Sequence, residues 1–113
     1  MNIEELRDYC LSLPEATEKM PLEGFFHNHE SLLTFNIGGH IFCMADINMS
    51  PVEATIKVDP DKINQLHEEY MAVGKPYNFS PTHWISVKAD GDMPDKLIYS
   101  LIADSYHLVK EKE

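Results

Sequence analysis

The residues best suited to binding chemistry lie in one stretch, residues 75–88, which read KPYNFSPTHWISVK. No acidic residue occurs between Tyr70 and Ala89, and a lysine stands at each end of the stretch. Aromatic rings stack on nucleic-acid bases, whereas lysine, amide, hydroxyl and imidazole groups bind phosphates and base edges. If nucleic acid binds here, the residues expected to contact it are Lys75, Tyr77, Asn78, Thr82, His83 and Lys88.

The same stretch allows two other interpretations. Phe79 and Trp84 could pack into the fold, with the polar residues simply placed at the end of a strand. The aromatic surface could instead contact another protein or a small ligand, because aromatic side chains supply a large apolar contact area. The residue types alone leave these three interpretations open.

The net charge of −10, from nineteen acidic and nine basic residues, argues against strong binding of nucleic acid. A protein this anionic repels phosphate backbones, whereas nucleic-acid-binding surfaces normally carry a basic patch. Lys75 and Lys88, with Lys57 on a neighbouring predicted strand, would neutralise about two or three phosphates. That number predicts a log–log salt slope of about −2 to −3, and therefore weak binding without sequence preference.

Metal-binding and catalytic signals are weak. His27 and His29 would share one face of a strand, but a zinc site needs more ligands than these two imidazoles. Glu4, Glu5 and Asp8 give a predicted helix an acidic face, which would bind hard cations only weakly without a shaped cage. We find no phosphate-cradling glycine loop, CxxC pair or nucleophile elbow. We therefore expect a non-catalytic protein with no catalytic residues, no metal site and no cofactor.

The two cysteines, Cys10 and Cys43, are too few for a disulfide framework or a metal site. Cys10 falls on the apolar side of a predicted helix, and Cys43 lies inside an apolar strand. Free cysteine is among the most frequently buried residue types. Both are therefore expected to be buried, reduced thiols.

The elements that must position these residues follow from apolar periodicity and from turn and cap residues. Gly38-Gly39 between two apolar runs indicates a two-residue hairpin turn, in which glycine supplies positive φ angles. Helices are expected over 3–13, about 60–71 and from Pro94 onward, and strands at 53–58 and 82–88, with a possible partner around 76–80. The hairpin predicts three opposed pairs on its core face, namely Ile37 with His40, Phe35 with Phe42, and Leu33 with Met44.

This order, α-β-β-β-α-β(β)-α, predicts an α+β two-layer sandwich in which helices cover one face of an antiparallel sheet. A chain of 113 residues is expected to form a single domain, residues 1–113. No segment approaches the roughly 20 apolar residues that span a bilayer, and the N-terminus lacks a signal-peptide pattern. We therefore expect a cytoplasmic protein without membrane contact, whose oligomeric state the sequence does not indicate.

The order of elements, together with three short clusters, resembles the MmcQ/YjbR family of small bacterial proteins. The clusters are the opening IEELRDYCLSLPEATE, an Asp-Pro helix start followed by EEY, and THWISV…DGDMPDKLIYSLIADSYHLV near the C-terminus. The resemblance covers essentially the whole chain. Its most specific part comprises His83-Trp84, Asp90-Gly91-Asp92 and Ser105-Tyr106.

This resemblance implies a CyaY-like fold, similar to that of frataxin, and DNA binding through a double-wing motif. One wing would be the stretch 75–88, and the other the hairpin at Gly38-Gly39, which adds His40. The resemblance implies no enzymatic activity. We therefore expect a small binding protein with weak, non-specific DNA binding as the first hypothesis. A protein-interaction or small-ligand module is the alternative, and an acidic, frataxin-like metal-binding domain is a further one.

Overall fold

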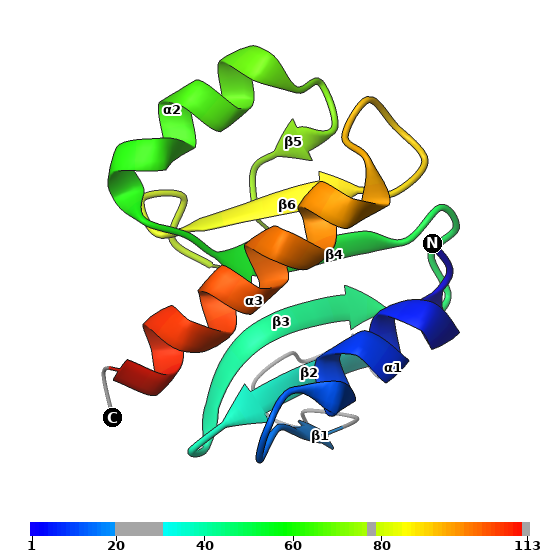
Figure 1. Cartoon of the computed structure of the whole chain (residues 1–113). Helices are drawn as coiled ribbons and strands as arrows, with labels where there is room; N and C mark the ends of the chain where they lie inside the picture. Colours follow the sequence, from blue (N-terminus) through cyan, green and yellow to red (C-terminus); the bar gives the residue numbers. More distant parts are fainter. Residues whose placement is uncertain (20–30, 77–78, 112–113) are drawn as a thin grey trace.

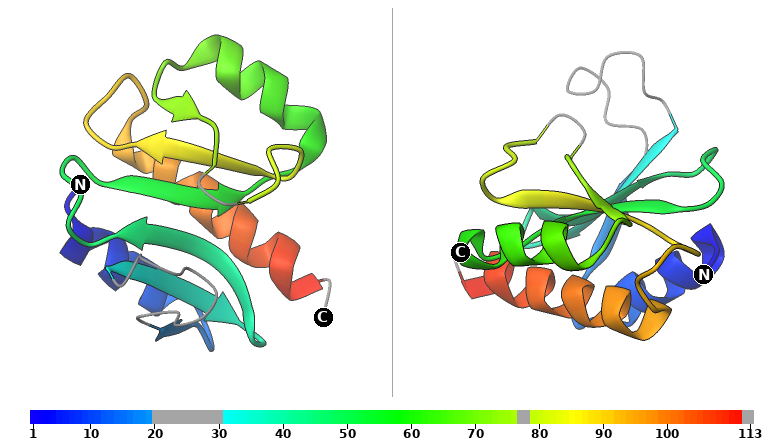
Figure 2. Two further views of the ribbon diagram at one scale, coloured as in Figure 1. Left: turned by 180° about the vertical axis from the view of Figure 1, so that it is seen from behind. Right: turned by 90° about the horizontal axis from the view of Figure 1, so that it is seen from above.

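The computed structural model describes residues 1–19, 31–76 and 79–111, and here three helices cover one face of an antiparallel sheet (Figures 1 and 2). The helices are α1 (Ile3–Ser12), α2 (Pro60–Glu69) and α3 (Asp95–Glu111). The strands are β1 (Thr17–Lys19), β2 (Leu32–Ile37), β3 (His40–Asp46), β4 (Glu53–Lys57), β5 (Val73–Gly74) and β6 (Trp84–Lys88). They pair in the order β1-β2-β3-β4-β6-β5. The predicted α+β two-layer sandwich is confirmed.

Local capping interactions fix where the first two helices begin. Asn2 and Glu5 form a reciprocal capping box, in which the Glu5 N–H donates to Asn2 Oδ1 at 2.8 Å and the Asn2 N–H donates to Glu5 Oε1 at 3.1 Å. Asp59 caps α2 by accepting a hydrogen bond from the Asp61 N–H at 3.0 Å, with Pro60 as the first helical residue. These side chains satisfy backbone donors that have no partner inside the helix. Both predicted helix starts are confirmed.

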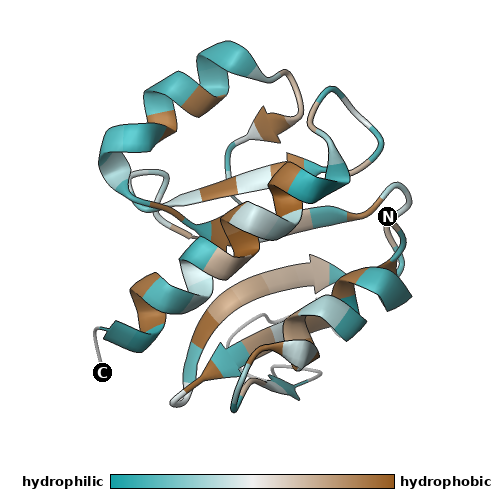
Figure 3. Cartoon of the chain, in the orientation of Figure 1, coloured by the Kyte–Doolittle hydropathy of each residue, from teal (hydrophilic) through white to brown (hydrophobic). Residues whose placement is uncertain are grey.

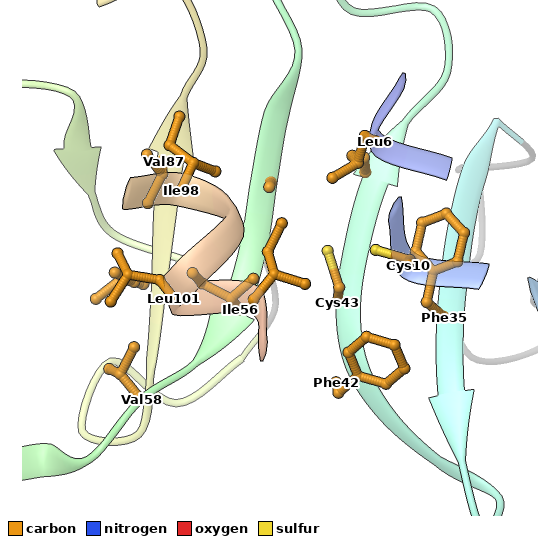
Figure 4. Close-up of a cluster of buried hydrophobic side chains, with 14 of the residues drawn as sticks. Leu6, Cys10, Phe35, Phe42, Cys43, Ile56, Val58, Val87, Ile98 and Leu101 are labelled. Atoms are coloured by element: carbon orange, nitrogen blue, oxygen red, sulfur yellow. The ribbon is translucent and has the colours of Figure 1, made fainter. Parts of the chain in front are cut away.

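The main core lies between the helices and the sheet. Figure 3 shows apolar and polar residues interspersed along the helices, as expected of helices that bury one side. Figure 4 shows part of this core, where side chains from α1 and α3 meet the inner face of the sheet. Its buried members include Leu6 and Cys10 of α1, Ile98, Leu101 and Ile102 of α3, and Phe35, Cys43, Ile56, Ile85 and Val87 of the sheet.

The two cysteines meet inside this core. Cys10 and Cys43 are free thiols with no exposed surface, and Figure 4 shows their sulfur atoms directed toward one another. A hydrogen bond with Cys10 and removal from water both raise the pKa of the Cys43 thiol well above its usual value. A thiol that stays protonated is a poor nucleophile and metal ligand. Both cysteines are buried thiols, as predicted.

A β-bulge corrects the predicted register of the first hairpin. Ile37 pairs with His40 as predicted, but Phe35 pairs with Cys43, and the register shifts between Phe35 and Asn36. Phe42 is the extra residue on β3, because Asn36 pairs with Ile41. A bulge inserts one residue into one strand only, and two glycines in a turn cannot reveal it.

Beyond the bulge every residue of β3 lies one position away from its predicted partner. Leu33 pairs with Ala45 instead of Met44. Met44 therefore faces away from the helices and packs in a second cluster with Leu32, Ile41 and Phe79. The prediction that Met44 faces the main core was wrong, because a shift of one residue moves a side chain to the opposite face.

Two short strands were also not predicted. Pro14, Pro21 and Gly24 predict a loop over residues 14–30, yet Thr17–Lys19 forms the edge strand β1 beside β2. The partner of β6 is β5, at Val73–Gly74, and not the segment around 76–80. Segments of two or three residues are too short for a period-two pattern to identify them.

The face of the sheet opposite the helices, called here the outer face, is more buried than the alternation of apolar and polar residues predicts. Along β4 the apolar residues Ala54 and Ile56 alternate with Glu53, Thr55 and Lys57, a pattern that predicts one buried and one solvated face. Thr55 is nevertheless only 4% exposed, and Ser86 on the neighbouring strand is 2% exposed. Thr34 and Asn36 on β2 are also buried. Buried polar groups need hydrogen-bond partners, and the described residues leave no buried side-chain polar atom without one.

An ion pair fastens β1 to α1. The Arg7 Nε and Nη2 atoms donate to the two Glu18 carboxylate oxygens at 2.7 and 2.6 Å. This hydrogen bonding lowers the pKa of Glu18 below its usual value. A carboxylate with a lowered folded-state pKa stabilises the fold above its unfolded-state pKa, and this contribution is lost as the pH falls through the folded-state value.

We therefore expect Arg7→Gln to lower the free energy of unfolding slightly near pH 7, because partly exposed ion pairs are screened by water. The difference from wild type should shrink as the pH falls below the ordinary glutamate pKa of 4.5, where the unfolded state takes up the proton first, and it should vanish once the pH is below the lowered folded-state pKa of Glu18. Urea unfolding at several pH values measures both effects. Lys62→Gln, on the exposed side of α2, is the control. An Arg7→Gln difference that does not change with pH would contradict this prediction.

Candidate functional site

The structure separates the residues predicted to bind nucleic acid. Lys75 directly follows β5, Thr82 and His83 lie in the turn before β6, and Lys88 is the last residue of β6. All four side chains are exposed. At about 3.3 Å per residue, the five steps from His83 to Lys88 span roughly 16 Å along the strand. The predicted contacts Tyr77 and Asn78 lie outside the described residues.

The register places two of the predicted phosphate-binding lysines near acidic residues. Lys88 is the cross-strand partner of Glu53, and Lys75 lines a pocket that also contains Glu53 and Asp46. Lys57 is instead the cross-strand partner of Trp84. Acidic neighbours reduce the positive potential that a phosphate backbone would meet.

The two aromatic residues of the stretch pack on one another. The rings of Phe79 and Trp84 are stacked, with centroids 4.4 Å apart and planes inclined by 26°. Phe79 also contacts the buried pair Leu32 and Met44. One face of each ring is therefore covered by the other ring, as the packing interpretation of this stretch requires.

The hairpin tip and the aromatic pair nevertheless lie close together. A hollow of about 450 Å³ is lined by residues from both, including Gly39, His40, Lys57, Phe79 and Trp84. These are the two segments that the double-wing interpretation pairs. Of the four described residues predicted to bind nucleic acid, none lines this hollow.

A second cavity, called here the outer-face pocket, combines apolar and charged groups. Its volume is about 310 Å³. Five apolar residues and four polar or charged residues line it. The lining includes Leu32, Met44, Met49, Asp46, Glu53, Thr55 and Lys75.

Strand pairing explains how these side chains meet. Met44 pairs with Thr55, and Ala45 pairs with Ala54, so the next outward-facing positions on the two strands are Asp46 and Glu53. Thr55 in turn pairs with Ser86 of β6. Side chains two positions apart along a strand point to the same face. The outer-face pocket therefore lies over the pair Met44 and Thr55 and over the next outward-facing positions, Asp46 and Glu53.

Hydrogen bonds orient both carboxylates of the outer-face pocket. Asp46 Oδ1 accepts from the Ser31 hydroxyl at 2.7 Å and from the Asn48 N–H at 2.9 Å. Glu53 Oε1 accepts from the buried Ser86 hydroxyl. A carboxylate has more lone pairs than these bonds use, so an oriented carboxylate keeps capacity for a ligand donor.

Sequence reasoning missed Asp46 and Glu53 as site residues. A signal was present, because the two acids flank the connection between two predicted antiparallel strands and so had to lie near each other. Lys75 was predicted, but as a phosphate ligand on an exposed wing. Its place beside two carboxylates depends on β5, which was not predicted.

The described residues contain no group of three or more His, Cys, Asp and Glu side chains placed to hold a metal ion. Of the acidic residues on α1, Glu5 is used in the capping box. His27 and His29 lie outside the described residues. Asp46 and Glu53 alone give two carboxylates, fewer oxygen ligands than calcium takes.

Comparison with known proteins identifies the family. A family model described as YjbR matches residues 11–108. The chain belongs to the YjbR family. It is 26% identical over 106 residues to uncharacterized protein YjbR of Escherichia coli K12, covering 94% of this chain and 85% of that protein. It is also 32% identical over 75 residues to YbdF of Escherichia coli O157:H7, covering 66% and 62% of the two chains.

Solved structures share the fold. The Deinococcus radiodurans protein DR2400, a DUF419 domain, superposes with a TM-score of 0.87 at 28% identity, covering 98% of this chain and 80% of that one. A Pseudomonas syringae crystal structure superposes with a TM-score of 0.76 at 23% identity, covering 96% and 99%. The names of these proteins give no ligand or activity. Function must therefore be argued from the site itself.

Within the described ranges, no helix has the length and apolar character needed to cross a membrane. Cytoplasmic localisation stays a prediction.

Proposed function

We propose that this YjbR-family domain is a non-catalytic binding module that takes a small organic molecule in the outer-face pocket. The observation that carries this proposal is the lining, which places two oriented carboxylates and a lysine around an apolar floor. Ligand sites in proteins are typically apolar concavities with a few placed polar groups. The outer-face pocket has this composition.

The size of the pocket limits the ligand. Ligand sites commonly measure about 300–1,000 Å³, and the outer-face pocket is close to the lower limit at about 310 Å³. Leu32 and Met44 form a buried floor, whereas Met49 is 43% exposed at the rim. A compact molecule of the size of a metabolite fits this space. A folded protein partner would contact only the rim.

Charge favours a small ligand over a nucleic acid. The chain carries a net charge of −10, and two of its acidic residues, Asp46 and Glu53, line the outer-face pocket together with Lys75. A phosphate backbone approaching Lys75 would meet both carboxylates. The repulsion between like charges weakens with distance and with added salt. Salt screens it least when the charges are close together inside a pocket.

DNA binding by a double wing remains the second candidate, supported by the hollow that joins the hairpin tip to Trp84. Its cationic residue is Lys57, with His40 beside it. One or two charges support only weak, salt-sensitive binding.

Chemical-shift mapping distinguishes the two candidates. We expect members of a fragment library, at about millimolar concentration, to shift the amide resonances of Asp46, Thr55 and Lys75. A 15-base-pair duplex at low salt should leave these resonances unchanged. Duplex-induced shifts at His40 and Lys57, with no fragment bound in the outer-face pocket, would overturn the proposal in favour of the double wing.

Two exposed methionines provide a matched pair of variants. Met49 lines the rim of the outer-face pocket, whereas Met71 is 95% exposed and lies outside it. Met49→Asp should weaken binding of any fragment hit about tenfold or more, because it removes apolar contact and adds a carboxylate. Met71→Asp should leave fragment affinity within twofold of wild type. Equal effects of the two substitutions would also overturn the proposal.

A further inference from the structure

The charges in the outer-face pocket have opposite signs and come from different elements. Asp46 and Glu53 are supplied by β3 and β4, whereas Lys75 follows β5, on the far side of β6 in the strand order. The apolar floor of Leu32 and Met44 lies beneath the same cavity. A ligand complementary to this lining needs a cationic group, an anionic group and an apolar part.

We propose that the outer-face pocket selects a free α-amino acid with an apolar side chain, bound as its zwitterion. The ammonium group donates to Asp46 and Glu53, and the carboxylate accepts from Lys75. The side chain covers Leu32 and Met44 and reaches the rim at Met49. This inference rests on the proposed function and adds the chemical class of the ligand.

Simpler ligands leave one charge of the outer-face pocket unsatisfied. A molecule with only an ammonium group would place a second cation in the same small pocket as Lys75. A molecule with only a carboxylate would place a third acid near Asp46 and Glu53. Lys75 is exposed and the two carboxylates are half-buried, so a zwitterion gains ion pairs with both signs of charge, whereas each half gains pairs with one sign only and meets like charge from the other.

A metal ion is a poorer match for the same groups. Two carboxylates and the Thr55 hydroxyl supply fewer oxygen ligands than calcium takes, and Lys75 adds a cation to the lining. The Ser31 hydroxyl donates to the Asp46 carboxylate, and the Ser86 hydroxyl donates to the Glu53 carboxylate. Each carboxylate is therefore oriented by its own serine. An organic ammonium group, with three donors, can use such separate acceptors.

Three probes with one hydrocarbon chain test the inference. L-Leucine carries both charges, 3-methylbutylamine lacks the carboxylate, and 4-methylpentanoate lacks the amine. Binding is measured by chemical-shift titration near pH 7 and low ionic strength, following the amides of Asp46, Thr55 and Lys75. We expect L-leucine to bind with a Kd of about a millimolar or below. Each of the other two probes should bind at least tenfold more weakly.

Two substitutions should give opposite patterns across the probes. Glu53→Gln keeps an acceptor for Ser86 but removes the negative charge, so it should weaken L-leucine and 3-methylbutylamine about tenfold and leave 4-methylpentanoate unchanged or tighter. Lys75→Met should weaken L-leucine and 4-methylpentanoate and spare the amine. Merely structural damage would weaken all three probes together. The matched controls are Glu68→Gln on α2 and Lys96→Met on α3, both exposed and outside the pocket.

The outcomes separate the two proposals. If L-leucine binds in the outer-face pocket with this crossed pattern, both stand. If library fragments bind there but L-leucine is no better than its two analogues, the ligand class is overturned and the proposed function survives. If no small molecule shifts the pocket resonances, the proposed function fails together with the inference.

Discussion

Tyr106→Ala is expected to lower the free energy of unfolding by about 4 kcal/mol, the largest single effect expected here. Tyr106 is 2% exposed, and its ring meets Phe42 edge-on with centroids 5.5 Å apart. Its hydroxyl donates to the Pro14 carbonyl oxygen at 2.6 Å, which ties α3 to the chain leaving α1. Removing the ring leaves a cavity where α3 meets the bulge of β3, and it breaks this link.

Urea unfolding followed by circular dichroism measures this loss. Because small domains have only about 5–15 kcal/mol of stability, Tyr106→Ala should be partly unfolded at moderate urea concentrations. Tyr106→Phe keeps the ring and loses only the hydrogen bond to Pro14, so it should cost about 1 kcal/mol. Met71→Ala, at a position 95% exposed, is the control and should be neutral. A cost below about 1 kcal/mol for Tyr106→Ala would contradict the packing described here.

Ser105→Ala is expected to cost about 2–3 kcal/mol, although it removes a single oxygen atom. The Ser105 hydroxyl accepts from the Lys57 N–H at 3.0 Å and donates to the Phe42 carbonyl oxygen at 2.7 Å. The pairs between β3 and β4 end at Cys43 and Ile56, and the strands diverge beyond them (Figure 1). Ser105 thus bridges two backbone groups that the sheet itself no longer pairs.

Alanine at this position leaves a buried N–H and a buried carbonyl group without the bridging hydroxyl, and each unsatisfied buried group is costly. Equilibrium unfolding measures the loss of stability, and hydrogen exchange should show faster exchange at the Lys57 amide. Ser100→Ala, on the exposed side of the same helix, is the control and should be neutral or slightly stabilising, because alanine favours helices. Equal effects at positions 100 and 105 would show that the bridge contributes nothing.

Ser105 and Tyr106 are adjacent, yet sequence reasoning anticipated only one of them on the packing side. The helical spacing of Ile98, Leu101, Ile102 and Ser105 predicts that Ser105 lies on the packing side, and the structure confirms it as fully buried. Periodicity did not predict Tyr106, which is buried as well. A long helix that packs on a sheet buries a broad face, which can include neighbouring residues such as Ser105 and Tyr106. How broad this face is depends on the strands that the helix covers.

The candidate site was predictable only in part. Lys75 and the aromatic pair were identified as the notable group, and the structure places Phe79 and Trp84 in a stack that packs on the outer face. The outer-face pocket was missed, because Asp46 and Glu53 stand at the ends of two strands on either side of a connection and were not recognised as neighbours. Whether nucleic acid, a protein or a small molecule binds this face stays a prediction.

The sequence by itself determined the features that neighbouring residues control. Asn2 and Asp59 begin helices, and Gly38 and Gly39 turn the hairpin with φ angles of 59° and 82°. These features depend on interactions within a few positions along the chain. Short-range geometry and hydrogen bonding suffice to specify them.

Only the tertiary structure decided the bulge at Phe42, the strands β1 and β5, and the enclosure of Thr55 and Ser86. Each depends on a partner far away in sequence, because an extra residue or a two-residue strand is stable only when another element pairs with it or covers it. The outer-face pocket arises in the same way. Its carboxylates and its lysine become neighbours only when β3, β4, β6 and β5 are assembled in that order.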